Sequence, residues 1–341
     1  MAQPLVAILG TRYEDFAIEE EIFAPLDVAL VSGDGAGPAE ILDTAAQADV
    51  ILAGSRPRFT AEVIAGLRAK GIVRYGVGTE KIDVEAARRA GIAVARVSDY
   101  GTEAVAFHAV TLATTQLRRI LEADRTVRAG QWGVGPLRPL HLPSTLTAGI
   151  VGYGRIGRQA ARYFRGLGFA VCAFDAYVTV PDGDGVENTS LEDLLERSDV
   201  VSLHAPGRPD GWPLLDAQLL GAMKPGSVLV NTARGSLIDV PALVEGLAAG
   251  RPARAALDVH PQEPPDLALF GDVADRIVFT PHMAWYTDES EVDLRRKASE
   301  EAARLLRGEP LRDPVVDPDA GTGDRREGGG ERQRAGGRGD T

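Results

Sequence analysis

The chain has 341 residues, more than a single hydrophobic core ordinarily spans, and we therefore expect two domains. Hydrophobic residues make up 44% of it and charged residues 25%, a globular composition that excludes disorder of the whole chain. The net charge of −12 repels nucleic-acid phosphates, and no stretch reaches the roughly 18 apolar residues of a membrane helix. The start also lacks the charges of a secretory signal, so we expect a cytoplasmic protein with no nucleic-acid or membrane partner.

The first part of the chain alternates short β-type runs with helical stretches. Alanine, leucine and glutamate dominate the helical stretches, and glycine follows two of them closely, as is typical of a helix C-terminus. This alternation predicts a parallel sheet covered by helices. The predicted strands are Leu5–Leu9, Val28–Val31, Val50–Ala53, Ile72–Tyr75 and Ile92–Ala95, and the predicted helices are Pro38–Gln47, Thr60–Lys70 and Val84–Ala90.

The stretch Thr102–Arg128 contains no glycine or proline and predicts one long helix, which we interpret as a bridge between domains. Further on, Ser190 is expected to cap a helix that ends near Arg197, and Glu289–Leu306 is expected to form the last helix. Residues 318–341 are rich in glycine and charge and are expected to be disordered. A second parallel sheet is predicted from the strands Ala148–Val151, Ala170–Phe174, Val200–His204, Val228–Asn231, Ala255–Asp258 and Ile277–Thr280.

The strongest local motif is a G-x-G-x-x-G sequence that follows the predicted strand Ala148–Val151 and opens a helix. The first glycine of such a turn permits the tight bend, the second lets the backbone approach a pyrophosphate, and the third lets the helix pack closely on the strand. The first amides of the helix then face the phosphates. We therefore assign pyrophosphate binding to Gly152, Gly154, Arg155, Ile156 and Gly157.

An acid stands where a dinucleotide site needs one. Asp175 ends the next predicted strand, 23 residues after Gly152, and can accept hydrogen bonds from the adenosine ribose hydroxyls. The same carboxylate repels a ribose 2′-phosphate, and residues 176–180 contain no basic side chain to bind one, so the pattern favours NAD over NADP. The alternative interpretation is an ordinary glycine turn in an α/β domain.

Hydride transfer to a carbonyl needs a proton donor, a group that tunes the donor and a cation that orients the substrate. Three loops after predicted strands supply such residues. Arg234 can hold a carboxylate with two parallel hydrogen bonds, Glu263 lies on a proline-stiffened loop, and His282 is an acid–base residue whose imidazolium form a carboxylate stabilises. Taken singly, each has a structural alternative, namely a surface ion pair, a solvated acid and a structural histidine.

In order and spacing the chain resembles the D-isomer-specific 2-hydroxyacid dehydrogenases, from about Leu5 to Val316. The resemblance implies an α/β fold with two Rossmann-like, doubly wound parallel-sheet domains of the formate/glycerate dehydrogenase type. It also implies a discontinuous substrate domain, residues 1–101 and 286–317, an NAD-binding domain, residues 102–285, and a homodimer. The pieces that carry the resemblance are Gly152–Gly157, Met223–Gly235, Ala256–Val259, Glu263-Pro264, Thr280–His282 and, for the substrate loop, Tyr75–Thr79 with Ile82-Asp83.

The resemblance implies a catalytic set of Arg234, Glu263 and His282, with NAD as cofactor and no metal. His282 would exchange the proton with the substrate oxygen, Glu263 would keep the imidazole protonated and oriented, and Arg234 would bind the carboxylate of a small anionic substrate. Backbone amides of Val77 and Gly78 would complete the carboxylate site. The residues expected to line the cofactor, besides the glycine turn and Asp175, are Thr102, His204, Ala205, Pro206, Thr232, Ala233, Arg234, Asp258 and His282.

The chain also departs from the family pattern. The sequence of the loop 207–213 differs from the one usual in the family. Arg208 in this loop is either an anion ligand or the exposed partner of Asp210. His108 is interpreted as structural. Trp285, next to the catalytic loop, is assigned to the substrate site as a pocket wall, with a buried anchor as the alternative.

Substrate identity stays open between two classes. A simple D-2-hydroxy acid or 2-oxo acid is the leading expectation, but Arg56, Arg74 and Arg208 can together favour a second anionic group, as in phosphoglycerate, phosphonopyruvate or a hydroxyphosphonate. A rival from another class is an NAD(H)-sensing protein, because Asp99–Glu103 and Pro281–Tyr286 resemble the branch that contains the C-terminal-binding-protein corepressors.

Overall fold

The computed structural model describes residues 3–208 and 210–318 of the chain. It divides into two compact units, Met1–Ser98 with Val292–Thr341 (unit 1) and Asp99–Glu291 (unit 2), and each unit has a sheet of its own. The tail that we expect to be disordered lies outside the described residues, apart from residue 318. The expectation of an α/β fold with two parallel-sheet domains is confirmed.

Unit 1 contains a six-stranded sheet in the order β13-β5-β4-β3-β1-β2. The first five strands along the chain are parallel and follow a common doubly wound order, with its switch point between β1 and β3. The strands are β1 (Leu5–Leu9), β2 (Ala29–Gly33), β3 (Val50–Ala53), β4 (Gly71–Arg74), β5 (Ala93–Ala95) and β13 (Pro314–Val316). The helices are α1 (Ala17–Phe23), α2 (Pro38–Ala45), α3 (Ala61–Ala65), α4 (Val84–Ala90) and most of α11 (Asp288–Arg307).

Unit 2 contains a seven-stranded parallel sheet in the order β12-β11-β10-β9-β6-β7-β8. Counted from β6, this is the strand order of a dinucleotide-binding fold, with its switch point between β6 and β9. The strands are β6 (Thr147–Val151), β7 (Ala170–Phe174), β8 (Glu187–Asn188), β9 (Val200–Leu203), β10 (Val228–Asn231), β11 (Arg254–Leu257) and β12 (Ile277–Phe279). The α-helices are α5 (Thr102–Leu117), α6 (Ile120–Arg128), α7 (Arg155–Gly166), α8 (Leu191–Arg197), α9 (Ala217–Ala222) and α10 (Val240–Ala249).

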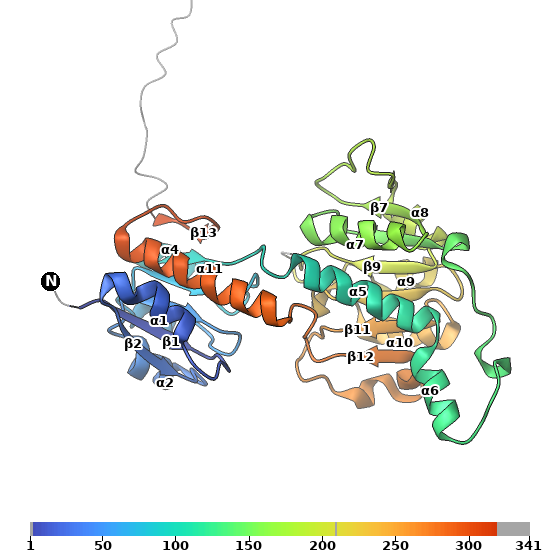
Figure 1. Ribbon diagram of the computed structural model, residues 1–341, viewed down its shortest axis with the longest axis horizontal. Helices are drawn as coiled ribbons and strands as arrows, with labels where there is room; N and C mark the ends of the chain where they lie inside the picture. The colour runs from blue at the N-terminus through green and yellow to red at the C-terminus, as the bar shows by residue number, and fades with distance from the viewer. Residues whose placement is uncertain (1–2, 209, 319–341) are drawn as a thin grey trace, which may run out of the picture. The chain divides into compact units, whose positions relative to one another are not determined.

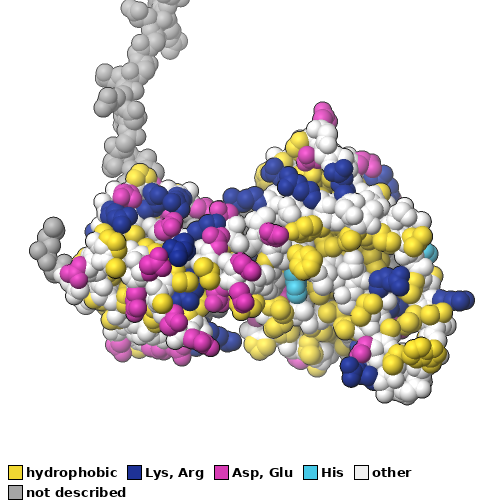
Figure 2. Space-filling model, viewed as in Figure 1, with side chains coloured by type: hydrophobic (Ala, Val, Ile, Leu, Met, Phe, Trp, Pro, Cys, Tyr) yellow, Lys and Arg dark blue, Asp and Glu magenta, His cyan; other side chains and the backbone are white. Residues whose placement is uncertain are grey.

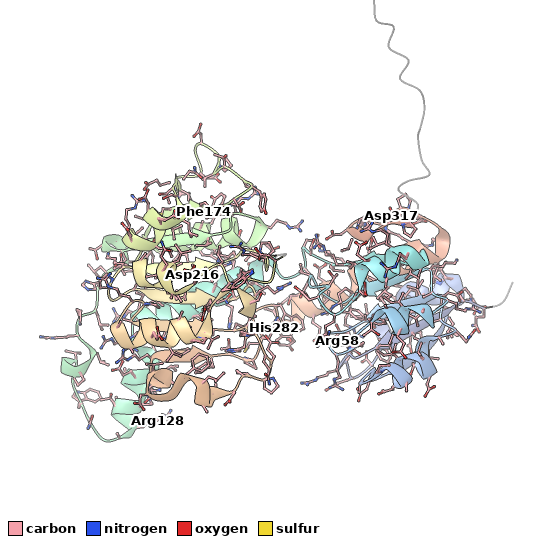
Figure 3. The ribbon with its side chains drawn as sticks, turned by 180° about the vertical axis from the view of Figure 1, so that it is seen from behind. Arg58, Arg128, Phe174, Asp216, His282 and Asp317 are labelled. Carbon is pink, nitrogen blue, oxygen red and sulfur yellow. The ribbon has the colours of Figure 1, made fainter. Side chains whose placement is uncertain are left out.

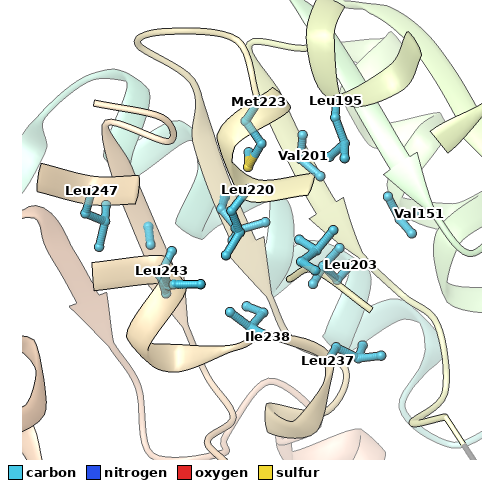
Figure 4. Close-up of a cluster of buried hydrophobic side chains, with 14 of the residues drawn as sticks. Val151, Leu195, Val201, Leu203, Leu220, Met223, Leu237, Ile238, Leu243 and Leu247 are labelled. Atoms are coloured by element: carbon cyan, nitrogen blue, oxygen red, sulfur yellow. The ribbon is translucent and has the colours of Figure 1, made fainter. Parts of the chain in front are cut away.

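Hydrophobic clusters cover both faces of the unit 2 sheet. Ile150 and Val200 belong to the cluster that includes residues of α5 and α7, whereas their strand neighbours Val151 and Val201 belong to the cluster with α8, α9 and α10. Successive side chains of a strand point to opposite faces, so the two clusters lie on the two sides of the sheet. Figure 1 shows α5 and α7 across one face, and Figure 4 shows the cluster on the other, with leucines of α9 and α10.

The long helix predicted over Thr102–Arg128 is wrong in two respects. It is broken into α5 and α6, because Arg119 adopts a left-handed conformation with a φ of 50°. It is also no bridge, since α5 belongs to unit 2 and buries Ala106, Ala109 and Ala113 in that unit's core. Among the described residues, no helix has the length and apolar character needed to cross a membrane.

The other predicted elements differ mainly at their ends. Every predicted strand is present, with ends within about two residues of the prediction. The Ser190 cap is present, with its hydroxyl accepting the Asp193 amide at 3.1 Å. The helix predicted at Thr60–Lys70 is shorter, and β13 was not predicted; it pairs antiparallel at the sheet edge, where proline is tolerated.

Candidate active site and cofactor site

The turn after β6 carries the glycine motif at the switch point of the sheet. Gly152 has a φ of 93°, a conformation that favours glycine, and a Cβ there would lie 2.7 Å from the backbone nitrogen of Ala205. A Cβ at Gly157 would lie 1.9 Å from the carbonyl oxygen of Gly152, so this position also requires glycine. The turn after β6 therefore lies against the turn after β9, where a doubly wound sheet binds its ligand.

The N-terminus of α7 is open to an incoming anion. Gly154 precedes the helix, and apart from its chain neighbours no described atom lies within 4 Å of the position of its Cβ. Within the described part of the chain no side-chain hydrogen bond caps this 12-residue helix and its first turn holds no acid, so its positive end favours an anion. This end of the helix fits the pyrophosphate of a dinucleotide.

Asp175 stands directly after β7 and is held over the glycine turn. One carboxylate oxygen accepts the amide of Tyr153 at 2.6 Å, and the other accepts the amides of Tyr177 and Val178 at 2.8 and 3.0 Å. The side chain is half-buried. Its position beside the pyrophosphate turn is the one that a ribose-binding acid needs.

Two further turns at this edge of the sheet follow β9 and β10. The imidazole of His204 is bonded to the hydroxyl of Ser202 at 2.9 Å, and burial lowers the pKa of His204 to about 4, so it is neutral near pH 7. Thr232 is buried, and its hydroxyl has no hydrogen-bond partner within the part of the chain that the structure describes. A buried hydroxyl without a partner at this place is consistent with a bound ligand.

The loop that carries Arg234 is shaped by the buried Asn231. The amide group of Asn231 donates to the carbonyl of Arg234 at 2.8 Å and accepts the amide of Ala233 at 3.0 Å, which closes a tight turn after β10. A Cβ at Gly235 would lie 2.0 Å from the carbonyl carbon of His260. Glycine here thus lets the Arg234 loop pack directly on the loop that carries Glu263.

Glu263 and His282 are hydrogen-bonded to each other. The Nδ1 atom of His282 lies 3.1 and 2.9 Å from the two carboxylate oxygens of Glu263, and the backbone amide of His260 donates to the same carboxylate at 3.2 Å. Both side chains remain partly exposed, at 48% for His282, which Figure 3 labels, and 40% for Glu263. With Nδ1 bound to the carboxylate, Nε2 is the nitrogen left to exchange a proton with a substrate.

Asp258 organises the His282 loop from inside the protein. Its carboxylate accepts the hydroxyl of Thr280 at 2.5 Å and the amides of Met283 and Ala284 at 3.0 and 2.9 Å, and its carbonyl accepts the amide of His282 at 2.8 Å. The Asp258 side chain is 1% exposed. Wrapped around this carboxylate, His282 adopts a φ of 55°, a strained conformation of the kind found at functional sites.

His108 lies behind the same loop. Its Nε2 atom is 3.3 Å from the hydroxyl of Thr280 and 3.7 Å from a carboxylate oxygen of Asp258. Burial lowers the pKa of His108 and outweighs the opposing effect of Asp258. Because the Thr280 hydroxyl donates to Asp258, neutral His108 is the donor to Thr280, in agreement with its structural interpretation.

Trp285 lies at the start of α5, where a Cβ on Gly101 would be 3.6 Å from the Cβ of Trp285. The ring of Trp285 is half-buried and makes edge contacts with Tyr100 and Tyr286, at centroid distances of 6.1 and 5.6 Å. These contacts anchor the end of the His282 loop to the segment before α5. Thr102 is the first residue of α5 and is half-buried.

Val77 and Gly78 lie in unit 1, in the turn after β4, and both are half-buried. Arg74 at the end of β4 donates from Nε to the carbonyl of Gly78 at 2.9 Å. Its Nη1 atom donates to the carbonyls of Tyr75 and Ala53 at 2.8 and 3.0 Å. The guanidinium therefore belongs to the framework of this turn.

The other two arginines considered for a second anion are paired with carboxylates. Arg208 makes two hydrogen bonds with Asp210, at 3.1 and 2.6 Å, in an exposed loop. Arg56 forms an exposed ion pair with Asp34 at 2.9 Å. Of the two interpretations of Arg208, the structure favours the ion pair.

Three contributors to the site were not singled out from the sequence: Asn231, Gly235 and Thr280. Asn231 is the last residue of a buried strand, and an asparagine there is a usable signal for a side chain that closes a turn. The need for glycine at 235 comes from a second loop distant in sequence, and the Thr280 hydroxyl acts through Asp258, so neither carries a local signal.

Residues 110–284 match the family model for the NAD-binding domain of D-isomer specific 2-hydroxyacid dehydrogenases. The chain is 34% identical over 281 residues to a D-3-phosphoglycerate dehydrogenase of Archaeoglobus fulgidus, covering 81% of this chain and 53% of that protein. It is 34% identical over 286 residues to a D-3-phosphoglycerate dehydrogenase of Mycobacterium leprae, covering 83% of this chain and 54% of that protein. The chain thus spans about half the length of the curated relatives it matches.

Solved structures of D-lactate dehydrogenases also match the chain. The apo D-lactate dehydrogenase of Escherichia coli matches with a TM-score of 0.79 and 28% identity, covering 92% of this chain and 100% of that one. The D-lactate dehydrogenase of Aquifex aeolicus, complexed with NAD and lactic acid, matches with a TM-score of 0.82 and 26% identity, covering 92% and 99%. The family match covers most of unit 2, including the glycine turn and the loops of Arg234, Glu263 and His282. The chain belongs to the D-isomer specific 2-hydroxyacid dehydrogenase family, and residues 110–284, which match its NAD-binding domain, lie within unit 2.

Proposed function

We propose that the protein is an NAD-dependent oxidoreductase that transfers hydride between nicotinamide and C2 of a small D-2-hydroxy acid or 2-oxo acid. The observation that carries the proposal is the Glu263–His282 pair, with Nδ1 bound to the carboxylate and the loop of Arg234 packed against that of Glu263. A paired imidazole, with an arginine on a loop packed against that of its carboxylate partner, supplies the groups for protonating a carbonyl next to a carboxylate. The relatives named D-3-phosphoglycerate and D-lactate dehydrogenase support this reaction class.

NAD supplies or accepts the hydride when it is bound. In the reductive direction Nε2 of His282 donates a proton to the substrate carbonyl oxygen, and in the oxidative direction it removes the proton from the hydroxyl. Glu263 fixes the orientation of the ring through its contacts with Nδ1. Arg234 binds the substrate carboxylate and stabilises negative charge that develops on the carbonyl oxygen.

The residues that would hold NAD all belong to unit 2. The glycine turn and the start of α7 bind the pyrophosphate, and Asp175 accepts the ribose hydroxyls. The open Cβ position at Gly154 and the unpartnered hydroxyl of Thr232 support this assignment. Further contacts to the cofactor are assigned to Thr102, His204, Ala205, Pro206, Thr232, Ala233, Arg234, Asp258 and His282.

We assign binding of the substrate's anionic group to the backbone amides of Val77 and Gly78 and a contact with the substrate to Trp285. The division into a substrate domain of residues 1–101 and 286–317 and an NAD-binding domain of residues 102–285 is part of the same proposal, as is a cytoplasmic location.

Within this function, an unphosphorylated 2-oxo acid is the leading substrate. The D-3-phosphoglycerate dehydrogenases among the relatives favour the phosphorylated or phosphonate alternative. Against it, Arg56 and Arg208 are engaged by carboxylates. Turnover of NADH with glyoxylate, hydroxypyruvate, phenylpyruvate and phosphonopyruvate decides between the classes, and NADH binding without turnover of any 2-oxo acid would contradict the proposal and favour an NAD(H)-sensing protein.

We further propose that the protein is a homodimer and that unit 2 supplies the interface. In the described part of the chain α6 buries none of its residues, although its sequence is strongly amphipathic, and Trp132 beyond it is 91% exposed. Figure 2 shows hydrophobic side chains gathered where α5 and α6 lie. Sedimentation of wild type and Trp132→Glu tests this: a dimer that Trp132→Glu weakens is expected, and a wild-type monomer would contradict it. The exposed apolar residues in α6 and in the segment that follows it are Ile120, Leu121, Val127, Trp132, Val134 and Leu142.

A further inference from the structure

The turn after β4 is organised around the guanidinium of Arg74. Nε and Nη1 of Arg74 donate to three backbone carbonyls, those of Ala53, Tyr75 and Gly78, at 3.0, 2.8 and 2.9 Å. Two of these carbonyls belong to the turn and the third ends the neighbouring strand β3. One half-buried side chain thus fixes the turn to the sheet at both of its ends.

The amides of the same turn are used differently. The amide of Tyr75 donates to Ala53 and that of Gly76 donates to Arg74, at 2.9 Å in both cases. Within the described residues, the half-buried amides of Val77 and Gly78 donate to no backbone carbonyl and no side chain. Arg74 binds carbonyls of the turn, and the successive N–H groups of Val77 and Gly78 are left for another acceptor. Pairs of successive amides of this kind bind anions.

We propose that Arg74 is a positioning residue for the substrate-binding turn, and that it acts by holding carbonyls rather than by touching the substrate. The inference rests on the proposed function, because it assigns Val77 and Gly78 to the anionic group of the substrate. This role of Arg74 differs from the alternative in which Arg74 itself binds a second anionic group of the substrate. In the structure, two of the three nitrogens of its guanidinium are already committed to the carbonyls of the turn.

A second anchor holds the opposite side of the turn. The hydroxyl of Tyr75 donates to the carboxylate of Glu19 at 2.9 Å, and Glu19 is fully buried. Arg295 donates to both oxygens of that carboxylate at 3.0 and 2.6 Å, and Tyr13 stacks on its guanidinium at 4.5 Å. This network fixes the Tyr75 side chain, so Arg74 is needed for the path of the backbone beyond Tyr75 and not for its anchoring.

Lysine is the informative replacement, because it keeps the charge but offers one ammonium in place of a planar group that reaches three carbonyls. Arg74→Lys is expected to raise KM by about tenfold for every 2-oxo acid that the wild type turns over, phosphorylated or not, with a smaller change in kcat. The dissociation constant of NADH should stay unchanged, since the cofactor residues lie in unit 2. Arg88→Lys on the exposed face of α4 makes the same substitution in the same unit and should leave KM as in the wild type.

The outcomes separate the possibilities. An increase in KM confined to phosphonopyruvate or another phosphorylated compound would show that Arg74 contacts a second anion and would overturn the inference, as would an unchanged KM for all substrates. If thermal melting shows that Arg74→Lys does not fold, KM is compared between the wild type and Arg74→Gln, which keeps N–H donors without the charge. A wild-type protein that turns over none of the compounds would contradict the proposed function, whereas an active wild type with an unaffected variant contradicts this inference alone.

Discussion

The Nδ1 atom of His282 lies 3.1 and 2.9 Å from the two carboxylate oxygens of Glu263. The carboxylate is itself oriented by the backbone amide of His260, and the His282 backbone is oriented by the carbonyl of Asp258. Both partners are therefore fixed by main-chain contacts. In this geometry Nε2 is the nitrogen that exchanges the proton, and the chemistry depends on how rigidly the loop is held.

Two alanine substitutions should separate folding from cofactor binding in the glycine turn. Gly157→Ala places a Cβ 1.9 Å from the carbonyl oxygen of Gly152 and should lower the free energy of unfolding by several kcal/mol, on the order of 1–3 or more. Gly154→Ala meets no such atom, so it should fold normally but bind NADH at least about tenfold more weakly, by obstructing the pyrophosphate. Thermal melting and NADH titration measure the two effects.

Gly166→Ala is the control for both variants. It lies at the end of the same helix, and no described atom outside its own helical turn lies within 4 Å of its Cβ position. Melting and NADH affinity close to the wild type are expected. An equal loss of stability in Gly154→Ala and Gly157→Ala would show that the turn does not discriminate as its geometry implies.

Asp175→Arg should shift the cofactor preference from NADH towards NADPH. The change removes the acceptor for the ribose hydroxyls and places a guanidinium where a 2′-phosphate would lie. The ratio of the two dissociation constants should change by at least about tenfold. Asp175→Asn, which loses the charge without adding a cation, should weaken the preference less. A ratio unchanged in Asp175→Arg would place the ribose elsewhere.

Thr280→Val should lower kcat by about tenfold with little change in NADH affinity. The substitution conserves volume approximately but removes the hydroxyl that joins His108 to Asp258, whose carboxylate holds the His282 loop. Thr280→Ser keeps the hydroxyl and should retain most of the activity. If Thr280→Val weakens NADH binding as strongly as it lowers kcat, the Thr280 hydroxyl does not act mainly through the His282 loop.

His204 should make the free energy of unfolding depend on pH. The pKa of His204 is about 4 in the folded protein and about 6.5 when unfolded, so the unfolded chain takes up the proton first. The contribution of neutral His204 is fully present above about 6.5 and is lost as the pH falls towards 4, at up to about 1.4 kcal/mol per unit. The free energy of unfolding of wild type and His204→Asn, measured across this range, should show a shallower slope for the variant. Equal slopes would contradict the assignment of this effect to His204.

Much of the fold and of the cofactor turn could be predicted because local patterns determine them. Gly152 and Gly157 are required by backbone contacts within one strand–turn–helix unit, and Asp175 follows the adjacent strand. The break at Arg119 could not be predicted, since nothing in the composition of Thr102–Arg128 marks it. The three-residue strand β13 has too short a pattern to recognise, and its pairing with β5 joins distant parts of the chain.

The roles of charged side chains were the hardest to predict. Arg74 and Arg208 were both candidates for binding a second anion, yet Arg74 holds three carbonyls and Arg208 is paired with Asp210. Which partner an arginine finds depends on the path of the backbone around it. The role of Asp258 depends likewise on a loop that returns from the next strand, residues 280–284.

The most direct test of the account compares His282→Gln with the wild type for NADH oxidation by a panel of 2-oxo acids and for NADH binding. His141→Gln, a change of the same kind at an exposed histidine, is the control. We expect turnover by the wild type and by His141→Gln, and a loss of about two to four orders of magnitude in His282→Gln with NADH affinity nearly intact. Substantial activity in His282→Gln would contradict the assignment of His282 as the proton donor.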